Sequence, residues 1–296
     1  MSRRGLIMFL SIAAIIGAIV FRITQSTKEK NAKENEATSA TCFKLTGSRI
    51  DGYYYNLCGK DVVIPSNVAG VEITVIGESA FENLQITSVT LPETLIKIEQ
   101  FAFNKNNIEK VVFPEKVTYI GKNAFSNNKL TSIEFKSKKV EFGETPFNNN
   151  QLDDKNAFIY DMTYGDNTHI VSYAGKNREN VVIPKGVTDI GAYSFSDLEI
   201  KKLTLNKELS TIGNGAFVGN LFEEITIPDS VVYFGDNLLN YDIKRVNVEN
   251  KNNKEDFGYY GMQTFPDNVL KFKGKTKKSE KELQLEEELK LKEGIK

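Results

Sequence analysis

The chain offers few side chains suited to catalysis or metal binding. Its 296 residues contain a single histidine, His169, so a site built from several histidines is excluded and a Ser-His-Asp arrangement has only one candidate base. The acidic residues at 153–154 and from Asp161 to Asp166 do not follow a calcium-loop pattern, and no P-loop or dinucleotide-binding glycine pattern occurs. We therefore expect a protein that is not an enzyme and has no metal or cofactor.

Cys42 and Cys58 are the only cysteines. The sequence around them is β-like, with a turn at Gly47, and places the two cysteines on opposite arms of a predicted hairpin. We expect them to form a disulfide, for which the chain-entropy model gives about 3 kcal/mol. Such a bond persists in an exported protein.

Asparagines recur at regular intervals along the chain. One interpretation is a ladder for glycans or metal ions. We favour another: asparagine accepts left-handed turn geometry and hydrogen-bonds the neighbouring backbone, as a regularly repeated bend requires. The residues are Asn83, Asn106, Asn127, Asn128, Asn149, Asn150 and Asn220.

These asparagines belong to a repeat that makes up most of the chain. From Ile108 to Lys129 the skeleton reads I-x-x-V-x-F-P, then V-x-x-I-G, then x-x-A-F and an Asn-rich link, and it returns at Leu130. A spacing of 22 residues separates Pro92 from Pro114 and Pro114 from Lys136. A fixed period in the range of about 20–29 residues is typical of a leucine-rich-repeat-like solenoid.

The physics of one repeat explains its period. The end of I-x-x-V-x-F alternates inward and outward as a strand does, and proline, which has no N–H to donate, ends it. V-x-x-I is a second extended run, and G-x-x-A-F fits a tight helical turn with glycine at the bend. Stacking buries one phenylalanine per repeat, at about 1.5–3 kcal/mol each. The expected aromatic columns contain Phe81, Phe103, Phe125, Phe147, Phe195 and Phe217.

The motif L-x-x-V-x-L-P-x-x-V-x-x-I-G-x-x-A-F-x-x-N resembles the BspA-type leucine-rich repeat family of bacterial surface proteins, from about Val62 to about Val248. The resemblance implies a mainly β leucine-rich-repeat solenoid with a parallel strand face and short helical turns. It also implies a non-catalytic cell-surface binding protein that contacts a protein or a cell-surface glycan. The alternative is a structural or scaffolding envelope protein without a dedicated ligand. The chain departs from the motif at Lys136, Asn206 and Leu238-Leu239.

Composition changes along the chain predict its division into segments. An apolar run from Gly5 to Phe21 follows Arg3 and Arg4, which indicates a signal anchor with the solenoid outside the membrane, or a signal peptide removed on secretion. The net charge of −1 argues against nucleic acid as a partner, and we expect a monomer. The expected segments are 1–23 signal anchor or signal peptide, 24–41 polar stalk, 42–61 N-terminal cap hairpin, 62–152 first array, 153–180 cap-like insertion, 181–250 second array, 251–275 C-terminal cap and 276–296 charged tail.

The insertion at 153–180 resembles the N-terminal cap. Phe158-Ile-Tyr matches Phe43-Lys-Leu, His169-Ile matches Arg49-Ile, and Tyr173-Ala-Gly175-Lys matches Leu57-Cys-Gly59-Lys. The insertion is either a hairpin within one continuous solenoid, which we favour, or the boundary between two short ones. His169 is then expected to be an exposed polar residue of a hairpin.

The residues at the x positions of I-x-x-V-x-L point outward and form the surface offered to a partner. In the C-terminal repeats they alternate in sign, so register predicts Glu223 and Glu224 between Lys201-Lys202 and Lys244-Arg245. The N-terminal repeats carry small and hydroxyl-bearing residues without such an internal use, and we place a ligand there. The candidate residues are Thr87, Ser88, Thr90, Glu109, Lys110, Val112, Thr131, Ser132 and Glu134.

Overall fold

The computed structural model describes residues 37–240, 242–249 and 267–273. The predicted anchor or signal peptide, most of the stalk, most of the C-terminal cap and the charged tail lie outside these ranges. Within them, we find no helix that is both long and apolar enough to cross a bilayer.

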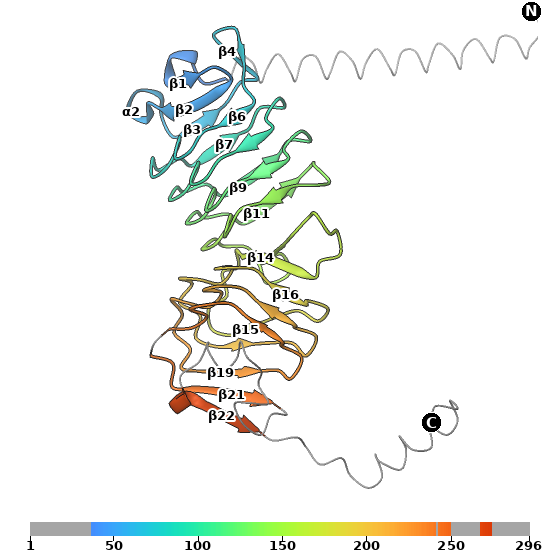
Figure 1. Cartoon of the computed structure of the whole chain (residues 1–296). Helices are drawn as coiled ribbons and strands as arrows, with labels where there is room; N and C mark the ends of the chain where they lie inside the picture. The colour runs from blue at the N-terminus through green and yellow to red at the C-terminus, as the bar shows by residue number, and fades with distance from the viewer. Residues whose placement is uncertain (1–36, 241, 250–266, 274–296) are drawn as a thin grey trace, which may run out of the picture.

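The chain forms an elongated stack of coils that runs from the first cap to β22 (Figure 1). Each coil contributes a front strand from I-x-x-V-x-F and a back strand from V-x-x-I, because both segments alternate inward and outward positions. The predicted mainly β solenoid with parallel strands is confirmed. The front column contains β3 (Asp61–Val63), β7 (Ser88–Thr90), β9 (Lys110–Phe113), β11 (Ser132–Phe135), β15 (Val181–Val182), β17 (Leu203–Thr204), β19 (Glu224–Ile227), β21 (Arg245–Glu249) and β22 (Leu270–Lys273). The back column contains β6 (Val75–Ile76), β8 (Lys97–Ile98), β10 (Tyr119–Ile120), β12 (Glu141–Phe142), β16 (Asp189–Ile190), β18 (Thr211–Ile212) and β20 (Tyr233–Phe234).

The back column is paired in register throughout each array. Ile120 lies opposite Ile98 on one side and Phe142 on the other. The front column is less regular: its paired groups are β3–β7, β9–β11, β15–β17 and β19–β21–β22. In the described ranges no strand pairing joins β7 to β9 or β17 to β19. A short antiparallel pair, β4 (Asn67–Val68) and β5 (Val71–Glu72), accommodates the five extra residues of the first repeat.

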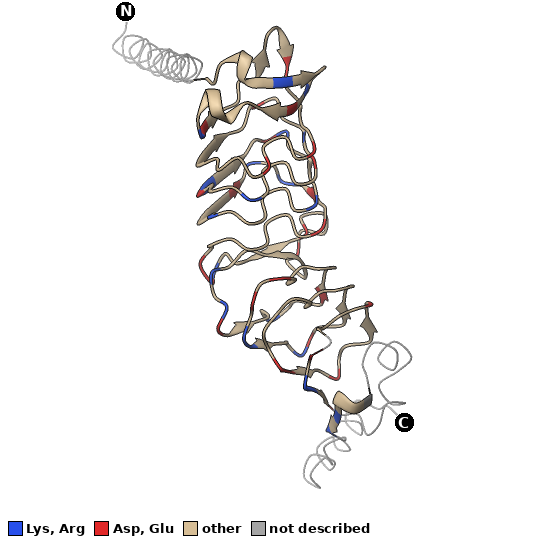
Figure 2. Cartoon of the chain, turned by 90° about the vertical axis from the view of Figure 1, so that its left-hand side faces the viewer, with Lys and Arg blue, Asp and Glu red and all other residues tan. Residues whose placement is uncertain are grey.

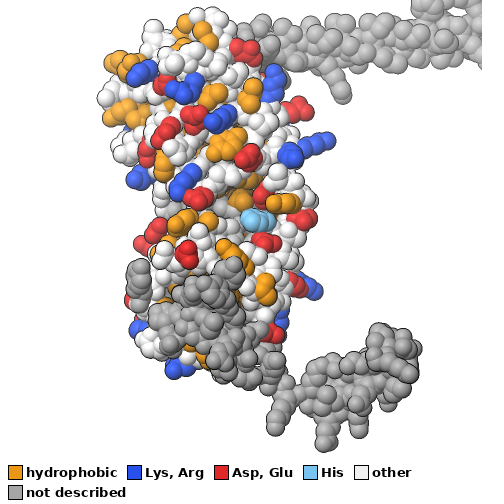
Figure 3. All heavy atoms as spheres, viewed as in Figure 1, with side chains coloured by type: hydrophobic (Ala, Val, Ile, Leu, Met, Phe, Trp, Pro, Cys, Tyr) orange, Lys and Arg blue, Asp and Glu red, His pale blue; other side chains and the backbone are white. Residues whose placement is uncertain are grey.

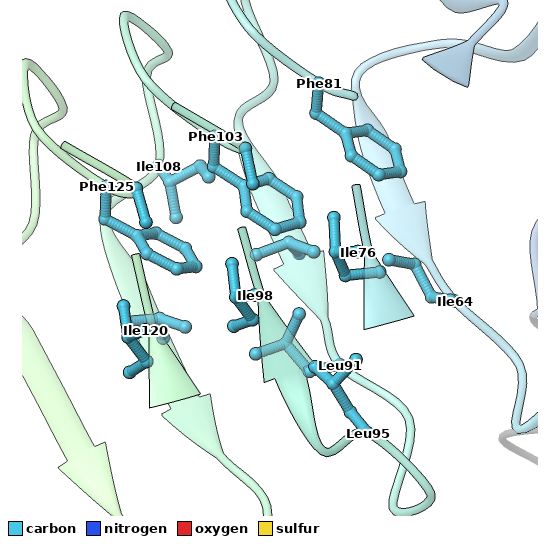
Figure 4. Packing of buried hydrophobic residues seen from close by; sticks show 14 of the residues in the cluster. Ile64, Ile76, Phe81, Leu91, Leu95, Ile98, Phe103, Ile108, Ile120 and Phe125 are labelled. Atoms are coloured by element: carbon cyan, nitrogen blue, oxygen red, sulfur yellow. The ribbon is translucent and has the colours of Figure 1, made fainter. Parts of the chain in front are cut away.

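Stacked phenylalanine rings form the centre of the core. Within the first array Phe81 lies 4.8 Å from Phe103, and Phe103 lies 4.9 Å from Phe125, between ring centroids (Figure 4). In the second array Phe195 and Phe217 are 5.9 Å apart. All of these rings are fully buried. The predicted aromatic columns are therefore confirmed within each array.

The turn before each of these phenylalanines is not helical. Phe101 and Asn123, which stand two residues before Phe103 and Phe125, have φ values of 57° and 54°, in the left-handed region that interrupts a helix. The expected helical turn is therefore wrong, because each corner reverses the chain by a left-handed residue instead. The glycine of V-x-x-I-G is needed for a different reason: a Cβ on Gly121 would lie 2.6 Å from the Gln100 backbone nitrogen of the preceding coil.

The asparagines after each phenylalanine are of two kinds. Asn83, Asn127 and Asn149 adopt φ values of 55–58° and form left-handed corners. Asn106, Asn128, Asn150 and Asn220 are buried and hydrogen-bond the backbone of their own and the preceding coil. Both structural roles expected of asparagine at a repeated bend are present.

Two hairpin caps head the two arrays. The first cap is β1 (Phe43–Thr46), β2 (Arg49–Tyr53) and the one-turn helix α2 (Tyr55–Cys58); the second is β13 (Phe158–Tyr160) and β14 (His169–Tyr173). Phe43 lies opposite Tyr53, as Phe158 lies opposite Tyr173. Each cap then pairs with its array in parallel, through Arg49 in the first cap and His169 in the second. The predicted match of these two residues is confirmed, although His169 is half-buried rather than exposed.

One part of the predicted match between the caps is wrong. Because Tyr173 lies opposite Phe158, it corresponds to Tyr53 and not to Leu57. The hydroxyl groups confirm this equivalence, since Tyr53 donates to the Cys58 carbonyl at 2.9 Å and Tyr173 donates to the Asn177 carbonyl at 3.0 Å.

The structure joins Cys42 and Cys58 in a disulfide, with the two Cα atoms 5.9 Å apart. Cys42 ends the short 3-10 helix η1 (Ala40–Cys42), and Cys58 ends α2. The bond therefore connects the two ends of the first cap, which is the pairing expected from the hairpin.

Hydrogen bonds also link the first array to the second across the insertion. Asn148 Oδ1 accepts from Ser172 Oγ at 2.6 Å, and Asn148 Nδ2 donates to the Tyr193 carbonyl at 3.2 Å. A parallel bridge between Leu152 and Gly175 continues the front column. These contacts bring the last coil of the first array against the second cap.

Candidate ligand-binding face

The nine residues predicted to face a ligand all lie exposed on the front column between β7 and β11. They share one face because β9 and β11 are paired in register, which sets Lys110 beside Ser132 and Val112 beside Glu134. Val112 is an apolar residue on this polar surface, with 43% of its area exposed. The predicted orientation of these side chains is thus what the structure shows; whether they bind a ligand stays a prediction.

Three of these side chains already make hydrogen bonds within the fold. The Thr131 hydroxyl donates to the Glu109 carbonyl at 3.3 Å. The Thr87 and Ser88 hydroxyls each donate a 2.7 Å hydrogen bond to Asp61 Oδ1 on the neighbouring strand β3. The hydrogen bonds from Thr87 and Ser88 hold the pKa of the Asp61 carboxyl below its ordinary value. The premise that these hydroxyl-bearing residues have no internal use is therefore wrong for Thr87, Ser88 and Thr131.

Glu223 and Glu224, predicted to lie between basic residues of both neighbouring coils, form ion pairs among the described residues only with the coil that follows them. Lys244 Nζ lies 2.6 Å from a Glu223 oxygen, and an Arg245 nitrogen lies 3.4 Å from a Glu224 oxygen. Lys201 does not pair with Glu223, because its ammonium lies 2.8 Å from Glu179 of the preceding coil. Lys201 has an acidic residue in each neighbouring coil, Glu179 before it and Glu223 after it, and it pairs with Glu179. Among the described residues, no ion pair crosses from the coil of β17 to that of β19.

A hollow of about 740 Å³ opens on the front column at this same place, between β17 and β19. Its floor is apolar and includes Phe222, Leu203 and Ile225, while Leu221 stands at its edge with 57% of its area exposed. Lys202, Lys207 and Glu249 contribute charged groups to the lining. The front face is thus hollowed where strand pairing and ion pairing are both interrupted.

Asn206 gives a physical reason for the opening. It replaces the proline that follows the front strand in most repeats, and its Nδ2 donates to the carbonyls of Pro184 at 2.6 Å and Val187 at 2.9 Å in the preceding coil. These bonds fix the end of β17 to the coil before it, while β19 pairs with the coil after it. The missing proline at Asn206 is therefore one contribution to the hollow, but it does not predict the hollow by itself, because Lys136 also replaces this proline.

The backbone of the hollow has hydrogen-bonding groups to offer. The Val181 N–H donates to Lys202 O, so Lys202 turns its peptide groups toward β15. In a parallel strand, successive residues direct their N–H and C=O groups toward the strands on opposite sides. Leu203 therefore directs its N–H and C=O toward β19. The Arg245 N–H donates to Glu223 O, which by the same rule turns the peptide groups of Glu224 toward β17. The two strand edges face each other across the opening without being paired.

Comparison with protein families accounts for most of the chain. A family model described as the BspA type leucine-rich repeat region matches it in six copies, over residues 48–162 and 168–273. The chain belongs to the BspA-type leucine-rich repeat family. The gap between the two matched ranges falls within the second cap, in the turn between β13 and β14.

Several solved leucine-rich repeat structures are similar to this BspA-type chain. A leucine-rich repeat protein from Eubacterium ventriosum is 25% identical, over 64% of this chain and 54% of its own, with a TM-score of 0.48. The pneumococcal vaccine antigen PcpA is 22% identical, over 64% of this chain and 62% of its own, with a TM-score of 0.39. A leucine rich cell surface protein from Faecalibacterium prausnitzii is 16% identical, over 82% of this chain and 88% of its own, with a TM-score of 0.34. This chain therefore spans less than two thirds of the first two proteins. A search of curated proteins finds no match.

The charged residues of this BspA-type solenoid do not assemble into a metal centre in the part of the chain that the structure describes. No group of three or more His, Cys, Asp or Glu side chains there could hold a metal ion. Acidic and basic residues are instead interspersed along the coils (Figure 2). The front face offers strand-edge peptide groups, short apolar stretches and paired charges.

Proposed function

We propose that this chain is an exported, non-catalytic protein that binds a protein or a cell-surface glycan on its front column. The hollow between β17 and β19 carries the proposal. It combines an apolar floor with unpaired strand edges, whereas the front strands on either side of it are closed by regular pairing. Binding there would bury the exposed Leu221 side chain and satisfy peptide groups that have no strand partner.

The hollow fits a protein ligand better than a glycan. Sugars are usually held by an exposed aromatic ring, and the one aromatic residue in the lining, Phe222, is only 8% exposed. An extended peptide segment brings both backbone hydrogen-bonding groups and apolar side chains, which match the groups that the hollow offers. The nine candidate residues between Thr87 and Glu134 lie on the same face, and we propose them as a second contact region.

We further propose that the arrays 62–152 and 181–250 act as one continuous body, so that both regions face one partner. The bonds of Asn148 to the second cap support this, since they connect the arrays without a linker. A monomer is sufficient for such a face.

The proposed location is the cell surface, through an N-terminal membrane anchor with the solenoid outside, or by secretion after cleavage. Proteins of the BspA type are bacterial surface proteins, and the Cys42–Cys58 disulfide is compatible with an oxidising compartment. Protease added to intact cells should remove the solenoid. Complete protection of the solenoid would reverse this assignment.

A scaffolding role without a dedicated ligand is the second candidate. The observation that favours it is the neutralisation of charge on the front column, where Lys201, Lys244 and Arg245 are all paired within the chain. A scaffold would need no open hollow, and this difference separates the two functions.

The experiment compares four forms of the full chain on an array of surface proteins and glycans. A hollow variant, Leu221→Asp with Lys202→Glu, should lose the bound protein. Ser132→Trp, in the second contact region, should weaken the same interaction. The control Ile96→Asp also places a charge on an exposed apolar residue, 44% exposed and outside the hollow, and should bind as the unmodified chain does. If the hollow and control variants retain the same binders, the hollow is not the site, and no binder at all would favour the scaffold.

A further inference from the structure

The helix α2 is present in the first cap and has no counterpart in the second. The two caps share an antiparallel hairpin, an irregularity in its pairing and the Phe–Tyr pair. After that pair the chain reaches the first front strand of each array through a segment of equal length, 54–60 in the first cap and 174–180 in the second. The first segment forms α2 and carries Tyr54, Tyr55 and Leu57, whereas the second is polar beyond Ala174 and forms no helix. Because the second cap heads its array without a helix at this place, α2 is not needed for capping.

The α2 segment, residues 54–60, presents apolar side chains to solvent. Tyr54, Tyr55 and Leu57 are 51%, 37% and 85% exposed, and no residue of α2 is buried. Exposed hydrophobic side chains lie over this end of the molecule in the space-filling view (Figure 3). A cluster of this kind, on an element that the fold does not require, indicates an interaction surface.

Three bonds hold the α2 segment in place. Cys58 is joined to Cys42 by the disulfide, the Tyr53 hydroxyl donates to the Cys58 carbonyl at 2.9 Å, and the Tyr54 N–H donates to the Cys42 carbonyl at 3.0 Å. An apolar surface that is already fixed loses little conformational entropy on docking. The first cap therefore holds these side chains in fixed, solvent-exposed positions.

The position of α2 in the chain places it near the N-terminal apolar run. Cys42, its covalent partner, lies where the chain enters the fold from its N-terminal segment. Residues 22–41 connect the apolar run Gly5–Phe21 to Cys42, and because each residue spans at most about 3.3–3.6 Å, this connection reaches at most roughly 70 Å. Once that run is inserted in a bilayer, α2 is confined near its surface, and confinement raises the effective concentration of the bilayer for α2.

The composition of the α2 segment is compatible with a lipid surface. Tyrosine is enriched at the boundary between lipid and water, and leucine in the adjoining acyl region. No acidic residue occurs from Gly52 to Lys60, so docking buries no carboxylate of this segment. The flanking carboxylates are held elsewhere, Asp51 by Arg49 and Asp61 by Thr87 and Ser88.

We propose that Tyr54, Tyr55 and Leu57 dock the first cap into the interfacial region of the lipid bilayer, so that the solenoid stands on the membrane by this end. The proposal rests on the proposed N-terminal membrane attachment. It adds a second contact, which orients the front column relative to the membrane.

The absence of tryptophan from the chain allows a direct test. Leu57→Trp in the full chain, reconstituted into vesicles of phosphatidylcholine and phosphatidylglycerol, introduces a single tryptophan at the proposed contact, which can be excited apart from the tyrosines. Its emission should shift to shorter wavelength, and lipids with brominated acyl chains should quench it at least twofold. The matched control is Val232→Trp, at an apolar residue of the second array that is 73% exposed, and it should show neither effect. Tyr54→Ser with Tyr55→Ser in the Leu57→Trp chain should reduce the quenching.

Flotation of the same vesicles separates the two proposals. If the chain floats with the vesicles but Leu57→Trp is quenched no more than Val232→Trp, the attachment stands and docking by α2 is overturned. If the chain does not float, the attachment fails, and docking fails with it. If Leu57→Trp becomes shielded only after an envelope protein extract is added, the occupant is a protein and the lipid assignment is wrong.

Discussion

The side-chain amide of Asn128 donates a 2.9 Å hydrogen bond to the backbone carbonyl of Phe103 in the preceding coil. Its Oδ1 accepts from the Ile108 N–H at 3.1 Å, and its Nδ2 also donates to the Phe125 carbonyl of its own coil. One buried side chain thus satisfies backbone groups that the corner leaves without a partner. Asn106, Asn150 and Asn220 repeat the arrangement.

Asn128→Ala should therefore destabilise the solenoid by about 3 kcal/mol, because it leaves buried N–H and C=O groups unsatisfied at about 1–3 kcal/mol each. Urea denaturation followed by circular dichroism measures the change. The matched control is Asn83→Gly, since Asn83 is exposed and glycine accepts the φ of 55° at this corner, and it should cost less than about 1 kcal/mol. Equal losses for the two variants would contradict the role assigned to Asn128.

Reduction of the Cys42–Cys58 disulfide should lower the free energy of unfolding by about 3 kcal/mol, because the bond closes a loop with a sequence separation of 16 residues. Thiol labelling of the denatured but unreduced chain should find no free thiol. Two reactive thiols would defeat both the bond and one argument for export. The effect should be confined to the first cap, so hydrogen exchange in the second array is the internal control.

Lys201 and Lys202 should respond differently to neutralisation. Lys201→Gln removes the ion pair with Glu179 and should cost about 0.5 kcal/mol, an effect that high salt reduces, because the pair is exposed. Lys202 makes no ion pair among the described residues, and Lys202→Gln should leave the urea midpoint unchanged. A larger loss for Lys202→Gln would show that charges do interact across the opening between β17 and β19.

Tyr173 should make stability depend on pH in the alkaline range. Burial, opposed in part by the nearby Arg178 guanidinium, raises the pKa of Tyr173 to about 12, whereas an unfolded tyrosine titrates near pH 10. The unfolded chain then releases this proton first, so the stabilising contribution is complete below about pH 10 and is lost as the pH rises toward 12. Tyr173→Phe should remove this part of the decline while losing the bond to the Asn177 carbonyl.

Ultraviolet absorbance of phenolate measures this titration directly. The component that ionises at highest pH should disappear in Tyr173→Phe. It should persist in the control Tyr164→Phe, because Tyr164 is 71% exposed. Loss of the same component from both variants would mean that the late titration is not that of Tyr173.

The sequence by itself determined the repeating part of this protein. A strand that alternates, a proline that ends it and a phenylalanine at a constant interval can bury their apolar side chains only by stacking identical coils, so Phe81, Phe103 and Phe125 had to lie above one another. The same logic matched Arg49 with His169, because both residues begin the pairing of a cap with its array. The cysteine pair followed from a hairpin that brings only two cysteines into the same cap.

Only the tertiary structure decided which neighbour each side chain uses. A coil in a stack has another coil on each side, and the period does not say toward which one Lys201 or Asp61 turns. Lys201 pairs with the coil before it, Asp61 binds the hydroxyls of the coil after it, and the amide of Asn206 binds the coil before it. The contacts of Lys201 and Asn206 both lead away from the coil of β19. Together they leave a hollow between β17 and β19 that the pattern of a single repeat does not predict. The corners were likewise beyond the pattern, because a left-handed residue and a helical turn both reverse a chain in the same few residues, and the packing of the next coil selects between them.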